Sequence, residues 1–123
     1  MLAVGERMMD DLDPGCDWVT AATRMATGFS GGCGNTRQEL CGALSGGVMV
    51  IGALFGRSSL DEDDEPAIDL AVRYRERFLE AFGHTQCCEL RDKVVNAPGG
   101  LGTCGALVER AARILINVLD EET

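Results

Sequence analysis

The sequence predicts an all-α fold: a compact bundle of about five helices with a glycine-rich helix at its centre, in one domain over residues 1–123. Apolar residues recur every three or four positions in several segments, and no segment alternates as a half-buried strand does. Capping residues and Gly or Pro clusters separate these segments. The composition, 46% hydrophobic and 25% charged, is that of a globular chain.

The N-terminal third of the chain predicts two helices and a loop. Residues 1–12 form the first helix, which ends at Asp13-Pro14-Gly15. Asp17 is expected to cap the second helix. The apolar face of that helix consists of Trp18 or Val19, Ala22, Met25, Ala26 and Phe29. A glycine-rich loop, residues 28–34, follows.

A long apolar helix is predicted from residue 36 to about Phe55. Thr36-Arg37-Gln38-Glu39 matches a capping box, the pattern that opens many helices. Each glycine inside a helix costs about 1 kcal/mol relative to alanine. Glycines there indicate that another helix, or a ligand, must approach the backbone closely. They are Gly42, Gly46, Gly47 and Gly52.

Three further helices are expected in the second half. The acidic run 61–65 reads as a solvated loop, and Pro66 suits the first turn of a helix that ends at Gly83. Its predicted inner face is Ile68, Ala71, Val72, Arg75, Phe78, Leu79 and Phe82. Thr85 caps a short helix over 85–91, and Thr103 caps the last one. The apolar stripe of the last helix is Leu107, Val108, Ala111, Ile114, Leu115, Val118 and Leu119.

Charge and hydropathy exclude some functions. A net charge of −9 argues against binding nucleic acid or an anionic membrane surface, because both require a basic footprint. The most apolar stretch, Ala43–Phe55, is too short to cross a bilayer, so we expect no membrane insertion. The N-terminus has no pattern of a secretory signal, and the expected compartment is the cytoplasm. In that reducing compartment six cysteines indicate redox, catalytic or metal chemistry rather than structural disulfides.

Several cysteines fall near predicted helix starts. Cys104 follows the cap Thr103, Cys87 and Cys88 lie in the first turn of the short helix, and Cys41 lies in the second turn of the long one. Free amides and the helix dipole at such positions stabilise a thiolate, which is both the nucleophile and the metal ligand. We expect only one member of the vicinal pair to take part.

The other candidate residues are less specific. His84 is the sole histidine and is the one candidate for a general base or a nitrogen ligand. Cys16 and Cys33 are interpreted as small apolar residues, with Cys33 as a candidate extra thiol in the glycine-rich loop. The sequence contains no C-x-x-C pair, and therefore no thioredoxin-like motif or zinc ribbon.

The hexapeptide 41–46, Cys-Gly-Ala-Leu-Ser-Gly, together with the preceding Gly28-Phe29-Ser30-Gly31-Gly32, resembles the core of the redox-active protein family named for its C-GCAxxG-C-C pattern. Residues 82–90 resemble that family's third cysteine region, and Cys104 resembles its last cysteine. Cys87 is the preferred match to the third cysteine, with Cys88 as the alternative. The resemblance spans roughly residues 2–119 and implies redox activity without a defined substrate.

The resemblance also implies two further points. The partner is expected to be a redox protein or a transporter-associated protein. The family's first cysteine precedes a segment like Leu2–Glu6, so we expect either a start upstream of Met1 or a member that works with the other three cysteines plus Cys16 or Cys33.

Three hypotheses follow for the function. The first is a thiol redox protein, a candidate thiol–disulfide oxidoreductase, in which Cys41 or Cys104 attacks, a second cysteine resolves the disulfide, and Cys87 or His84 assists; Gly42 and Gly46 would give a cofactor or substrate room at the backbone. The second is a zinc or iron–sulfur protein that uses Cys41, Cys87 and Cys104 as ligands, with His84 or an added cysteine as the fourth. The third is a non-catalytic helical interaction module. A homodimer is an expectation in each case.

Overall fold

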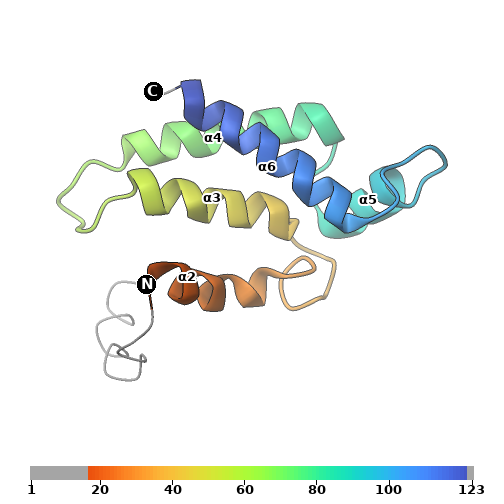
Figure 1. The fold of residues 1–123 in the computed structure, drawn as a ribbon, viewed down its shortest axis with the longest axis horizontal. Helices are drawn as coiled ribbons and strands as arrows, with labels where there is room; N and C mark the ends of the chain where they lie inside the picture. The colour runs from red at the N-terminus through yellow and green to blue at the C-terminus, as the bar shows by residue number, and fades with distance from the viewer. Residues whose placement is uncertain (1–16, 122–123) are drawn as a thin grey trace.

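The fold is described here for residues 17–121 of a computed structural model, and in these residues it is built from α-helices (Figure 1). The five α-helices are α2 (Trp18–Ala26), α3 (Gly42–Phe55), α4 (Glu65–Phe82), α5 (Cys87–Leu90) and α6 (Cys104–Glu121). A 3-10 turn, η2 (Thr27–Phe29), extends α2, and a π-helical turn, η3 (Arg91–Val95), extends α5. The described part of the chain contains no strand, and the predicted all-α class is confirmed. The helix expected over residues 1–12 lies outside the described residues.

The hydrophobic core lies where α3, α4 and α6 pack together, with α5 and η3 closing one end (Figure 1). Its centre on α4 is a stack of rings, in which Phe78 meets Tyr74 and Phe82 edge to face at centroid distances of 6.1 and 4.7 Å. The remaining core residues are Leu44, Ile51, Leu70, Leu90, Val95, Leu107, Ala111, Leu115 and Val118.

Close packing of α3 on α4 depends on Gly47. A Cβ atom at this position would overlap the ring of Tyr74. The Tyr74 hydroxyl in turn donates a 2.8 Å hydrogen bond to the carbonyl oxygen of Ala43, one turn earlier on α3. The packing explanation for the glycines of this helix therefore holds at Gly47. By contrast, a Cβ at Gly46 or Gly52 would meet no other atom within 4 Å.

The inner face predicted for α4 is partly wrong. Phe78 and Phe82 are buried as expected, but Ile68 is 54% exposed and Val72 is 47% exposed. The helix is rotated so that Leu70 and Tyr74 point inward instead. Tyr74 can occupy the core because its hydroxyl finds an acceptor on α3.

The apolar face of α2 is not covered by the described part of the chain. Asp17 caps this helix as predicted, accepting a 2.7 Å hydrogen bond from the amide of Thr20. None of the residues of α2 is buried, and Trp18 is 67% exposed. In Figure 1, α2 lies on the side of α3 opposite α4 and α6.

The predicted start of the long helix at Thr36 is wrong, because α3 begins at Gly42. Residues 31–37 form a loop in which six of seven residues have positive φ: Gly31, Gly32, Cys33, Gly34, Asn35 and Arg37. Left-handed residues cannot continue a right-handed helix. The capping box does not form, because the amide of Glu39 bonds the carbonyl oxygen of Gly32 and not the Thr36 hydroxyl, which accepts a 3.3 Å bond from the amide of Gln38.

The other predicted helix ends are close to the observed ones. Gly83 terminates α4 in the left-handed conformation, and the Thr103 side chain accepts a 3.1 Å hydrogen bond from the amide of Ala106 at the start of α6. The cap of α5 is Gln86 rather than Thr85. No helix in the described range 17–121 has the length and apolar character needed to cross a membrane.

Candidate functional site: a pocket lined by three cysteines

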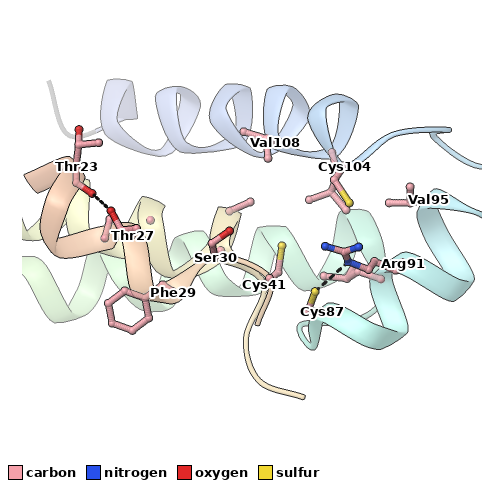
Figure 2. Close-up of a pocket in the computed structure, with 17 residues that line it drawn as sticks. Thr23, Thr27, Phe29, Ser30, Cys41, Cys87, Arg91, Val95, Cys104 and Val108 are labelled. Atoms are coloured by element: carbon pink, nitrogen blue, oxygen red, sulfur yellow. Dashed lines mark hydrogen bonds between the residues drawn. The ribbon is translucent and has the colours of Figure 1, made fainter. Parts of the chain in front are cut away.

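A pocket of about 560 Å³ opens between the η2 end of α2, the start of α3, the α5–η3 segment and the start of α6 (Figure 2). This volume is within the range of small-molecule sites. Three cysteines from distant parts of the sequence line it: Cys41, Cys87 and Cys104. Its walls are otherwise largely apolar, formed by Phe29, Ala43, Leu90, Val95, Leu107 and Val108.

Cys41 is the N-cap of α3, not a residue of its second turn as predicted. Its amide donates a 2.9 Å hydrogen bond to the carbonyl oxygen of Thr85, which ties the start of α3 to the segment before α5. Burial raises the pKa of the Cys41 thiol, and the nearby amides of Ala43 and Leu44 only partly oppose this effect. At this cysteine burial therefore acts against the thiolate that the helix start was expected to stabilise.

Cys87 is the first residue of α5 and is 5% exposed. The loop 31–40 wraps around this helix start and satisfies its amides: the Cys87 N–H bonds the carbonyl oxygen of Glu39 at 2.9 Å, and the Cys88 N–H bonds that of Arg37 at 2.8 Å. Since these donors are occupied by backbone, they are not free to stabilise a thiolate, contrary to the expectation from the sequence. Gly32 permits the close fit, because a Cβ there would lie 2.7 Å from the Cβ of Cys87.

A side-chain cation, and not a free backbone amide, contacts the sulfur of Cys87. The Nε of Arg91 lies 3.3 Å from the Sγ of Cys87 and donates a hydrogen bond to it. Figure 2 shows the guanidinium between the sulfur atoms of Cys87 and Cys104. The hydrogen bond with Cys87, followed by the charges of Cys104 and Cys87, raises the pKa of Arg91, so its guanidinium stays protonated.

Arg91 was not predicted as a member of the site. One signal was available: Arg91 follows Cys87 by four residues, so both side chains lie on one helical face. The π-helical turn that begins at Arg91 was not predictable in the same way. It is marked by the amide of Asn96, which bonds the carbonyl oxygen of Arg91 five residues earlier at 2.8 Å.

Cys104 is the first residue of α6, as predicted, and it is exposed. Thr103 caps the helix beside it. The charge of Cys104 acts on Arg91 more strongly than that of Cys41 does. Cys104 is therefore the pocket cysteine that combines access from solvent with proximity to the guanidinium.

Of the remaining predicted site residues, some line the pocket and others do not. Gly42 and Gly46 line the pocket. Cys88 and His84 do not line it, and the Nδ1 of His84 pairs with the carboxylate of Glu89 at 2.6 Å. Cys33 is an exposed free thiol of the loop, and Cys16 lies outside the described residues.

The predicted metal ligands are only partly brought together in the described residues, because His84 does not line the pocket. Although three cysteines line one pocket, residues 17–121 contain no group of three or more His, Cys, Asp or Glu side chains placed to hold a metal ion. The guanidinium of Arg91 lies between the sulfur atoms of Cys87 and Cys104 in Figure 2. The five cysteines of the described region are free thiols.

The fold and the pocket define a class: a small helical protein with clustered free thiols around an arginine. The chain belongs to the family described as "Putative redox-active protein (C_GCAxxG_C_C)", whose model matches residues 4–118. The resemblance found from the hexapeptide and the later cysteines is thereby confirmed. No curated protein and no solved structure matches the chain significantly.

Proposed function

We propose that the protein is a thiol–disulfide redox protein whose two-electron couple is the pair Cys87 and Cys104. The observation that carries the proposal is the convergence of free cysteines from separate segments on one pocket that contains a guanidinium. Membership of a redox-active family supports the same chemistry. A dithiol of this kind operates in a reducing compartment, in keeping with the expected cytoplasmic location.

Cys104 is the attacking residue in this proposal. It is exposed, so a substrate sulfur can reach it, and it is the first residue of the 18-residue helix α6. The Arg91 guanidinium adds a positive charge on the same side. Cys41 is less suited to the attack, since burial raises the pKa of its thiol.

Cys87 is the resolving residue. It is buried, so it does not meet a large substrate first, and its Sγ accepts a hydrogen bond from the Nε of Arg91. Once it reaches a mixed disulfide on Cys104, the Cys87 thiolate can attack the Cys104 sulfur. Cys41 remains a thiol beside the couple.

The reaction balances as two exchanges. The Cys104 thiolate attacks one sulfur of a disulfide RS–SR, the S–S bond breaks, and one RS⁻ leaves with the electron pair and takes a proton from water. The Cys87 thiolate then attacks the Cys104 sulfur of the mixed disulfide and releases the second RS⁻. The substrate disulfide is reduced by two electrons to two thiols, and the protein dithiol is oxidised to one disulfide.

The test is the number of free thiols before and after oxidation. Reduced protein is treated with bis(2-hydroxyethyl) disulfide, a neutral reagent, and its thiols are titrated under denaturing conditions. We expect the loss of two thiols, reversed by dithiothreitol. In Cys87→Ser the loss should fall to one thiol, held as a mixed disulfide on Cys104 that dithiothreitol reverses, and Cys104→Ser should give no intramolecular disulfide.

The matched control is Cys88→Ser, which changes the neighbouring cysteine on the same helix outside the pocket. It should retain the two-thiol loss. Persistence of that loss in both Cys87→Ser and Cys104→Ser, or its absence in the unchanged protein, contradicts the proposal. Zinc or iron bound in a fixed ratio to anaerobically purified protein, and lost in the same two variants, would favour a metal centre instead.

A further inference from the structure

The charge inside the pocket is opposite in sign to that of the protein. The chain carries a net charge of −9, yet Arg91 is the one side chain with a permanent charge among the described residues that line the pocket. The lining residues other than the cysteines therefore have a net charge of +1. An acidic protein that keeps a lone cation in an otherwise apolar cavity is arranged to receive an anion there.

Arg91 also keeps hydrogen-bond donors available for a ligand. Within residues 17–121 its guanidinium makes one hydrogen bond, from Nε to Cys87. Its two Nη groups have no acceptor among these residues. Arginine offers five N–H donors in a planar fork that matches a carboxylate, so this fork can still hold an anionic group while Nε contacts the sulfur.

The walls of the pocket restrict the rest of the ligand. Thr23 and Thr27 use their hydroxyl protons on carbonyl oxygens of α2, at 2.8 and 2.9 Å, and therefore add little polar character to the wall that they form. Leu90, Leu107 and Val108 complete an apolar lining. A cavity of about 560 Å³ holds a small molecule, whereas a folded protein partner could insert only a loop.

We infer that the substrate class of this site is a small organic disulfide with an apolar body and a carboxylate, which pairs with the Nη groups of Arg91 while its sulfur faces Cys104. The inference rests on the proposed function and deepens it. The chemistry is the exchange given above, with the carboxylate as an anchor that takes no part in bond making. The released products are two thiols that carry the same carboxylate.

The test compares three disulfides of similar size and different charge: dithiodipropionate (anionic), bis(2-hydroxyethyl) disulfide (neutral) and cystamine (cationic). The initial rate of protein disulfide formation is measured at 0.15 M salt, which screens distant surface charges. Each rate is divided by the rate of the same reagent with free dithiothreitol, to remove intrinsic reactivity. We expect a normalised preference of about tenfold or more for the anionic over the cationic reagent, as for one charge-assisted pair.

Variants assign the preference to Arg91. Arg91→Gln should reduce it to about twofold or less, and Arg91→Lys should retain most of it. The control is Arg113→Gln, which removes the same charge from an exposed arginine of α6 that pairs with Glu109 at 2.9 Å. This variant should keep the preference of the unchanged protein.

The outcomes separate the two proposals. Equal normalised rates for the three reagents in the unchanged protein, or a preference that survives in Arg91→Gln, overturns the anionic substrate class and leaves the dithiol chemistry standing. Failure of every reagent to form the protein disulfide overturns the dithiol chemistry itself. The comparison in the unchanged protein does not depend on the folding of any variant.

Discussion

The Nε of Arg91 lies 3.3 Å from the Sγ of Cys87, one helical turn away, and donates a hydrogen bond to it. The amides at this helix start are bonded to carbonyl oxygens of the loop 31–40, so the cation at the sulfur comes from a side chain. The pocket thus depends on two supports for one cysteine: a loop that fixes its backbone and an arginine that contacts its sulfur.

Gly32→Ala should impair the pocket through the loop. Gly32 has φ of +71°, and an added Cβ would lie 2.7 Å from the Cβ of Cys87. We expect a stability loss of about 1–2 kcal/mol from the left-handed backbone, and slower oxidation of the pocket by bis(2-hydroxyethyl) disulfide because Cys87 is displaced. Denaturant unfolding and the oxidation rate check the two effects.

Gly34→Ala is the matched control for this variant. Gly34 has φ of +64° in the same loop, but a Cβ there meets nothing within 4 Å. It should lose a similar stability and keep the oxidation rate. If both variants slow oxidation equally, general loosening of the loop, and not contact with Cys87, is the cause.

Gly47→Ala should destabilise the core. The new methyl group would overlap the Tyr74 ring, and overpacking of this kind costs about 1–3 kcal/mol. That cost exceeds the gain of about 1 kcal/mol for alanine over glycine in a helix. Gly52→Ala, on the same helix with open space around it, should instead stabilise the protein by up to about 1 kcal/mol. Urea unfolding of both variants checks the opposite signs, and destabilisation by both would refute the packing argument.

Ionisation of Tyr74 should lower the stability of the protein at alkaline pH. Burial, followed by the charge of Cys41, raises the pKa of Tyr74 from 10.0 to about 12. The unfolded state therefore releases this proton first, so the stabilisation is complete below pH 10 and is lost as the pH rises from 10 to about 12. Tyr74→Phe should lack this loss, although it should be less stable at neutral pH by about 1 kcal/mol because the bond to Ala43 is gone.

Two measurements check the tyrosine prediction. Because the chain has a single tyrosine, its absorbance near 295 nm reports Tyr74 alone. The free energies of unfolding of the unchanged protein and of Tyr74→Phe, measured at several pH values, give the contribution of Tyr74 ionisation to stability. A midpoint near 10 in the folded protein, or parallel pH curves for the two proteins, would contradict the expected burial.

Cys41 should react slowly with alkylating reagents at neutral pH. Burial raises the pKa of its thiol above the ordinary value of 9.0, so less thiolate is present at any given pH below that range. Trypsin releases Cys41 in peptide 38–57, which contains no other cysteine. The alkylation rate of this peptide's cysteine by iodoacetamide in the folded protein should rise at higher pH than in urea. The same midpoint in both states would show that the thiol is not desolvated.

Local chemistry allowed much of the fold to be predicted from the sequence. Asp17, Gly83 and Thr103 mark helix ends through their own side chains or backbone freedom, and the structure confirms all three. The start of the long helix was wrong because the loop 31–40 is held by bonds to residues 85–88, about fifty positions away. Such pairing leaves no periodic signal.

The site was predicted in part for the same reason. Placement of Cys41, Cys87 and Cys104 near helix starts is a local property, and these residues do line one pocket. The pKa of Cys41 is not local, since it depends on the elements that bury the residue. The position of Arg91 in the pocket and the inward orientation of Tyr74 likewise depend on packing between helices. The spacing of residues along one helix does not predict either of them.

The most direct test of the central claim is the connectivity of the disulfide in the oxidised protein, read by mass spectrometry of tryptic peptides without reduction. The Cys88→Ser variant is used so that peptide 78–91 contains Cys87 alone, while Cys104 lies in peptide 94–110. The account predicts a crosslink between these two peptides that dithiothreitol removes. A crosslink of Cys33 or Cys41 in its place, or peptides that remain separate after oxidation, would contradict it.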